Sequence, residues 1–156
     1  METPEREKSE TKDPEQASAE SRLSSPELEP LTASEEARRL ALAIAGAGLD
    51  KKASGIEIID VIGKVDYAEI LVLMTGRSER HVAAIASGIQ EDLKREKKTA
   101  PLSVEGLTAA KWVLIDYNDV VVHVFQQDAR LYYDLEGLWI DAGRIAVPSP
   151  TGRVDE

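Results

Sequence analysis

Five consecutive apolar residues, from Ile70 to Met74, constrain the fold more than any other part of the chain. A strand with one face in water alternates apolar and polar residues, whereas an unbroken apolar run is typical of a strand buried on both faces. Another strand is predicted at residues 56–62. The run at 70–74 is therefore expected to be the central strand of a sheet that is covered on both sides.

Helical patterns flank these strands. A first helix is predicted to begin at the capping-box spacing of residues 32–35 and to end at Gly46 and Gly48. A longer helix is predicted from its N-cap Ser78 to about residue 98, because apolar residues recur there at three- and four-residue steps. Both helices are expected to place one apolar face against the sheet.

Two further strands, 112–117 and 120–125, are separated by Asn118 and Asp119, a pair that tolerates the backbone angles of a two-residue turn. These strands are predicted to form an antiparallel hairpin. Because side chains alternate along a strand, one face of the hairpin is expected to be core. The other, mixed face collects Trp112, Leu114, Asp116, Val121, His123 and Phe125. Asp116 and His123 are expected to be neighbours on it.

A short strand at 102–104 and a last helix at 129–136, capped by Asp128 and ended by Gly137, complete the predicted elements. Several helices combined with an antiparallel strand pair indicate an α+β (mixed α/β) domain. This domain is expected to cover residues 31–145.

The two ends of the chain differ from this body in composition. Residues 1–30 carry nine acidic and four basic side chains and few apolar ones, so they are predicted to be a disordered acidic extension. Residues 146–156 contain Pro148 and Pro150 and are predicted to be a flexible tail.

Composition also excludes several classes of function. The chain has no cysteine, and its two histidines stand 42 residues apart, which disfavours a metal site. The net charge is −10 and no basic stripe is present, so little direct contact with nucleic acid is expected. The N-terminus lacks the pattern of a secretory signal, and no apolar run is long enough to span a membrane. We therefore expect a cytoplasmic protein without a membrane partner.

Three groups of residues could carry chemistry, and each also has a simpler structural explanation. Residues 75–78 join a strand to a helix N-terminus, which suits an anion, but a single glycine does not make a phosphate loop. Asp116, Asp119 and His123 could hold a metal or act as a general base, or could simply belong to the hairpin. Ser78 lies three residues before His81, yet no acid is placed to orient that imidazole.

Surface recognition is favoured by a concentration of aromatic residues in the last third of the domain. Tyr132, Tyr133, Leu138 and Trp139 follow the hairpin, which contributes Trp112 and other aromatic residues. Acidic residues stand among them, a composition typical of a protein-binding hot spot that faces a basic partner. The alternative is that these aromatic residues complete the core.

Four blocks of sequence resemble the ribosomal silencing factor (RsfS, Iojap-like) family. They are residues 75–82, 104–107, 112–125 and 133–139. The resemblance covers about residues 34–140, and the hairpin followed by Tyr133-Asp134-Leu135-Glu136 is its most specific part.

The resemblance implies a small nucleotidyltransferase-like mixed sheet flanked by helices, with no catalytic residues, cofactor or metal. It implies binding to the large ribosomal subunit through large-subunit ribosomal protein fourteen, which sterically blocks association with the small subunit and represses translation. A homodimer of the free protein is left open. The implied docking positions are Trp112, Asp116, Tyr117, Asp119, His123, Arg130, Tyr132, Tyr133, Leu135 and Trp139.

Two alternatives stand beside this function: a nucleotidyltransferase-like nucleotide-binding enzyme, and a factor for assembly of the large subunit. The enzyme would need carboxylates that converge on adjacent metal ions. The chain has no Gly-Ser pair followed closely by Asp-x-Asp. The sequence therefore favours a binding protein.

Overall fold

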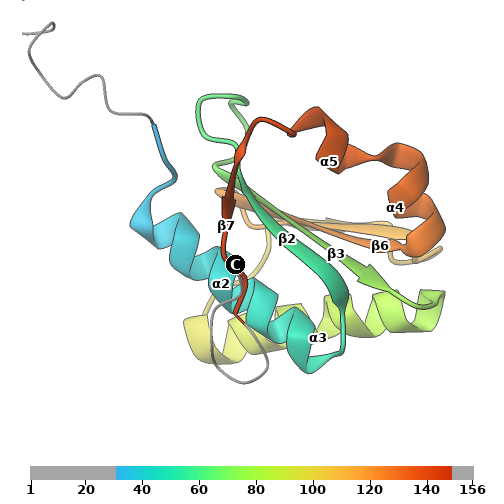
Figure 1. The fold of residues 1–156 in the computed structure, drawn as a ribbon. Coiled ribbons are helices and arrows are strands. Elements are labelled where there is room, and N and C mark those ends of the chain that lie inside the picture. The colour runs from blue at the N-terminus through green and yellow to red at the C-terminus, as the bar shows by residue number, and fades with distance from the viewer. Residues whose placement is uncertain (1–30, 149–156) are drawn as a thin grey trace, which may run out of the picture. The chain divides into compact units, whose positions relative to one another are not determined.

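The apolar run at 70–74 lies inside a six-stranded sheet in the computed structural model, which describes residues 31–148 (Figure 1). The elements in chain order are α2 (Glu35–Asp50), β2 (Ser54–Asp60), β3 (Ile70–Gly76), α3 (Glu79–Lys97), β4 (Ser103–Glu105), β5 (Trp112–Asp116), β6 (Val120–Gln126), α4 (Gln127–Tyr133), α5 (Leu135–Leu138) and β7 (Gly143–Ile145). No helix within this described part is long and apolar enough to cross a membrane.

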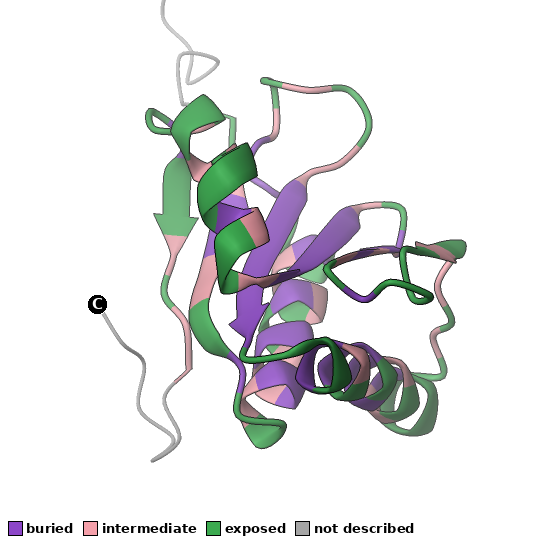
Figure 2. Ribbon diagram, turned by 90° about the vertical axis from the view of Figure 1, so that its right-hand side faces the viewer, coloured by how far each residue is buried: buried purple, intermediate pink, exposed green. Residues whose placement is uncertain are grey.

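The strands follow the order β4-β5-β6-β3-β2-β7 across the sheet, so β3 is central, as predicted. All seven residues of β3 are buried (Figure 2). It pairs in parallel with β6 and antiparallel with β2, and the remaining neighbours pair antiparallel. The prediction of a mixed α+β fold is confirmed.

The hairpin of β5 and β6 has the predicted register. Trp112 is opposite Phe125, and Ile115 is opposite Val122. Asn118 adopts a φ of 79°, the left-handed conformation that a tight two-residue turn requires.

Helices cover both faces of the sheet (Figure 1). α2 and α3 pack on one face and enclose a first apolar cluster that includes Ile58, Val72 and Val122. α4 and α5 lie on the opposite face, where a second cluster includes Leu73, Val121 and Phe125. The mixed hairpin face is thus also core along β6, because α4 contacts that strand.

The first helix begins and ends later than predicted. Its N-cap is Ser34, whose hydroxyl accepts a hydrogen bond from the Ala37 amide at 3.1 Å. It continues through both glycines to Asp50. A Cβ at Gly48 would lie 2.6 Å from Sδ of Met74, so this glycine allows the helix to approach β3 closely and does not end it.

The end of the domain also differs from the prediction. The last helix is divided into α4 and α5 at Asp134, which has a φ of 46°. The sequence pattern missed β7, whose three residues pair with β2 at the sheet edge. The proposed extension 1–30 and residues 149–156 of the proposed tail lie outside the described residues.

Candidate partner-binding site

A series of aromatic rings runs from the second cluster to the surface. Phe125 is fully buried and stacks on Trp112 with ring centroids 5.0 Å apart. The Trp112 ring lies 4.5 Å from that of Tyr133, which in turn meets Tyr132 edge-on at 5.0 Å. Such close pairs stabilise each other beyond the area they bury, so the buried end supports the outer rings.

Exposed apolar side chains lie close in sequence to the outer end of this series. Tyr132 is 82% exposed and Tyr133 is 51% exposed. Three aliphatic neighbours in sequence are each more than two thirds exposed: Leu131, Leu138 and Ile140. We call these five residues the docking face. Large apolar side chains that are exposed within one short segment are typical of a protein-binding surface.

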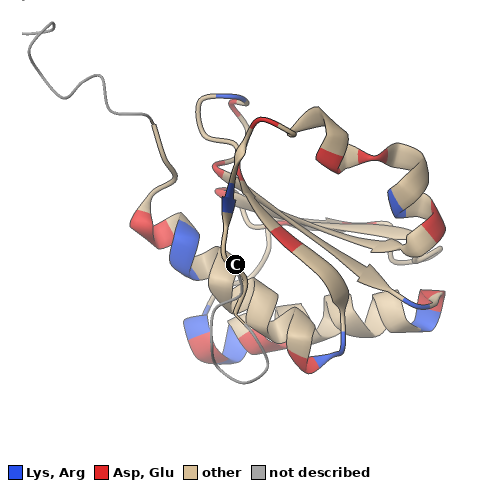
Figure 3. Cartoon of the chain, in the orientation of Figure 1, with Lys and Arg blue, Asp and Glu red and all other residues tan. Residues whose placement is uncertain are grey.

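Charge around the docking face is mostly negative. Residues 127–141 contain four acidic side chains and one basic side chain, which is Arg130 (Figure 3). Arg130 is buried and pairs with Glu136 at 2.9 Å, which leaves Asp128, Asp134 and Asp141 as the exposed acidic side chains of this segment. The face therefore presents apolar groups within an acidic border, which complements a basic partner.

Six of the ten implied docking residues belong to the aromatic series or pack beside it. They are Trp112, His123, Tyr132, Tyr133, Leu135 and Trp139. Leu135 and Trp139 are partly buried and pack on the second cluster beside Trp112. His123 is 7% exposed and its Nδ1 accepts a hydrogen bond from Trp112 Nε1 at 3.0 Å. Tyr132 and Tyr133 complete the group.

His123 is paired with Trp112 and not, as expected, with Asp116. One Asp116 carboxylate oxygen accepts the Asn118 amide at 2.8 Å, so this side chain stabilises the hairpin turn. Burial lowers the pKa of His123 to about 4, so the imidazole is neutral at physiological pH. A neutral ring can accept the tryptophan hydrogen bond, which fixes the indole between the core and Tyr133.

The side chains of the remaining implied docking residues do not form part of the docking face. Asp119 is in the hairpin turn, where burial and the nearby carboxylates of Glu69 and Glu36 raise its pKa. Tyr117 is buried in the first cluster, on the face covered by α2 and α3. Arg130 is buried beneath α4, where it bonds to groups of this chain.

The contribution of the buried Tyr117 hydroxyl to stability can be tested. Its hydroxyl is the one buried side-chain polar atom within residues 31–148 that has no hydrogen-bond partner, and burial raises its pKa to about 12. Tyr117→Phe is therefore expected to raise the free energy of unfolding by about 1 kcal/mol, because it removes an unsatisfied buried group. Urea denaturation measures the change, with Tyr67→Phe at an exposed position as the control. A loss of stability would show that the hydroxyl has an acceptor.

Three polar groups of the strand-to-helix connection at 75–78 are bonded within the fold. The Thr75 hydroxyl accepts from Arg130 at 2.8 Å, and the Arg77 amide donates to His81 Nδ1 at 2.9 Å. Ser78 caps α3 by accepting the His81 amide at 3.1 Å. These groups would have to break existing bonds before they could bind an anion.

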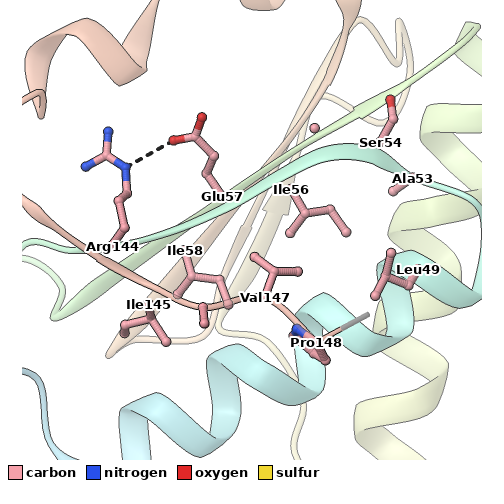
Figure 4. Close-up of a pocket in the computed structure, with 12 residues that line it drawn as sticks. Leu49, Ala53, Ser54, Ile56, Glu57, Ile58, Arg144, Ile145, Val147 and Pro148 are labelled. Atoms are coloured by element: carbon pink, nitrogen blue, oxygen red, sulfur yellow. Dashed lines mark hydrogen bonds and ion pairs between the residues drawn. The ribbon is translucent and has the colours of Figure 1, made fainter. Parts of the chain in front are cut away.

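A hollow of about 780 Å³ lies at the edge of the sheet formed by β2 and β7 (Figure 4). The end of α2, the beginning of β2 and the segment that follows β7 enclose it. Its wall includes apolar side chains such as Leu49, Ile56 and Val147, and its charged residues Glu57 and Arg144 bond to each other at 3.1 Å. None of the implied docking residues lines this hollow.

The sequence pattern missed Leu131 and Ile140 as surface residues. In a helix successive side chains point about 100° apart, so the inward direction of one residue determines those of its neighbours. Because Arg130 points inward, Leu131 points outward.

Comparison with known proteins indicates the family of this chain. The family described as "Ribosomal silencing factor during starvation" matches residues 34–156. The ribosomal silencing factor RsfS of Bacillus subtilis is 43% identical over 102 residues, which cover 65% of this chain and 86% of the relative.

Two solved structures share the fold. A crystal structure of a Chromobacterium violaceum protein matches with a TM-score of 0.63 at 33% identity and covers 65% of this chain and 84% of the other. A crystal structure of a Bacillus halodurans protein matches with a TM-score of 0.59 at 36% identity and covers 72% and 98%. Since the family match includes every described helix and strand, this chain belongs to the ribosomal silencing factor (RsfS) family.

Proposed function

We propose that this protein binds the large ribosomal subunit through large-subunit ribosomal protein fourteen and sterically blocks association with the small subunit. The family name supports ribosome silencing and translation regulation. The observation that carries the docking proposal is the aromatic series that ends at the exposed Tyr132. The protein would act in the cytoplasm, where it would repress translation.

The chemistry of the docking face supports a protein partner. Tyrosine and tryptophan are enriched at binding hot spots, because their rings bury a large area at a low entropic cost. Here Trp112 and Tyr133 are held by core contacts before any partner arrives, so little further ordering is required. The acidic border complements a basic ribosomal protein and repels RNA phosphates.

The proposal assigns a binding role and not catalysis. Two-metal phosphoryl transfer needs carboxylates that converge on adjacent ions. Within residues 31–148, no three His, Cys, Asp or Glu side chains are grouped so that they could hold a metal ion. At the connection 75–78, which is the candidate phosphate site of the enzyme alternative, the Thr75 hydroxyl, the Arg77 amide and the Ser78 hydroxyl are bonded within the fold.

Cosedimentation with separated ribosomal subunits tests the proposal. The protein is expected to sediment with the large subunit alone and to reduce formation of joined ribosomes when the small subunit is added. Purified ribosomal protein fourteen should compete for the protein. Binding to the small subunit, or binding to the large subunit without an effect on joining, would contradict the steric mechanism.

We expect the affinity for the large subunit to depend only moderately on salt. A few charge pairs at a protein interface should give a log–log slope below about 3, whereas neutralising six phosphates would give about 5. Titration between low and high potassium chloride measures the slope. A steep slope would indicate direct binding to ribosomal RNA.

A further inference from the structure

The segment that carries the docking face has few apolar anchors of its own. α4 has seven residues, of which only Arg130 is buried, and α5 has four residues, none of them buried. Isolated helices of this length are unstable in water, so contacts with the sheet must hold them in place. Ala129, Leu135 and Trp139 supply partial apolar contacts.

Arg130 provides polar contacts to three other elements. Its Nη1 donates to the Gly55 carbonyl of β2 and, at 2.8 Å, to the Thr75 hydroxyl of β3. Its Nε donates to Glu136 Oε2 of α5 at 2.9 Å. Glu57 Oε2 of β2 lies 3.8 Å from Nη2. The planar guanidinium makes these bonds in fixed directions, which a lysine ammonium cannot reproduce.

The sheet is shaped to receive this side chain. Gly55 has a φ of 58°, and a Cβ at this position would lie 2.9 Å from Arg130 Nη1. Glycine therefore leaves the space that the guanidinium occupies. On the same strand, Glu57 is also bonded to Arg144 of β7 (Figure 4). This second bond holds the Glu57 carboxylate near Arg130.

We propose that Arg130 is a positioning residue for the docking face: its buried guanidinium fixes α4 and α5 on the sheet, and this orients Tyr132 and Tyr133 toward the partner. This inference rests on the proposed function. It assigns Arg130 an effect on ribosome binding that passes through the tyrosines and involves no contact with the partner. The side chain is 9% exposed, which leaves almost no surface for such a contact.

Arg130→Lys in the full chain tests this role, alone and combined with Tyr132→Ala. We expect faster amide exchange confined to residues 127–140 and a loss of large-subunit affinity on the order of tenfold. In the Tyr132→Ala background the further loss should be much smaller, because the side chain that Arg130 orients is gone. Equal losses in both backgrounds, or unchanged exchange in α4 and α5, would overturn the proposal.

Glu136→Ala supplies a milder variant if Arg130→Lys does not fold. It removes one bond to Arg130, and Asp128→Ala is its matched control, since it removes the same charge from the same segment without a bond to Arg130. Both variants remove one charge of the acidic border and should lose some affinity, but only Glu136→Ala should also speed exchange in α4 and α5, and its loss of affinity should be the larger. If the two variants behave alike, the effect is one of charge and the positioning role is wrong.

The same experiments separate this inference from the proposed function. If Tyr132→Ala binds the large subunit as the parent does, the docking face is wrong. If Tyr132→Ala loses binding while Arg130→Lys and Glu136→Ala leave exchange and affinity unchanged, the docking face stands and the positioning role of Arg130 fails.

Discussion

Tyr132→Ala is expected to lower the affinity for the large ribosomal subunit by about 30- to 1,000-fold, because truncating an anchor aromatic typically costs about 2–4 kcal/mol of binding free energy. The melting temperature should remain nearly unchanged. The side chain is 82% exposed, so its removal leaves no cavity in the folded protein. Cosedimentation and a subunit-joining assay measure the loss, and thermal denaturation verifies the fold.

Tyr67→Ala is the matched control for this variant. Tyr67 is also an exposed tyrosine, but it lies between β2 and β3, outside the docking face. It should bind as the parent does. Trp139→Ala is a poorer test, because its ring packs on the second cluster and its loss affects stability as well. Parent-like binding by Tyr132→Ala would move the epitope away from α4.

Acidification from pH 6.5 to pH 4 is expected to lower the free energy of unfolding by about 3 kcal/mol through His123 alone. Burial lowers the pKa of this imidazole from 6.5 to about 4 in the folded protein. Between these values the unfolded chain binds a proton that the folded chain does not, so stability falls as the pH falls. The contribution of this residue levels off within about one pH unit above pH 6.5 and below pH 4.

His123→Gln isolates this contribution. A glutamine amide is neutral throughout the range, and its oxygen can still accept the Trp112 hydrogen bond. Urea denaturation of parent and variant at several pH values gives two curves, which share the effects of all other titrating groups. The difference in free energy of unfolding between parent and variant should change between pH 6.5 and pH 4. Parallel curves would show that His123 is protonated equally in both states.

Local patterns in the sequence were enough to predict the centre of the sheet. The unbroken run at 70–74 indicated a strand buried on both faces, and β3 is buried throughout. The two-residue loop at Asn118 and Asp119 determined the register of β5 and β6, because a short turn allows only one alignment. Ser78 was recognised correctly as the cap of α3.

The candidate site was predictable only in part. Tyr132 and Tyr133 follow the hairpin that contains Trp112, and from this the sequence analysis grouped the three residues. In the structure the Tyr133 ring contacts both of the others. The sequence pattern could not show which of these aromatic residues are exposed and which are buried. That distinction depends on which side chain of a short helix points inward, and the periodicity of a helix this short does not decide it.

By itself, then, the sequence determined the elements whose cause is local: the apolar central strand, the hairpin with its turn, and the long capped helix. The tertiary structure alone decided the parallel pairing of β3 with β6, the placement of β7 at the edge, and the burial of Arg130. These features depend on partners distant in sequence. A buried guanidinium is stable only because Gly55, Thr75 and Glu136 satisfy it together.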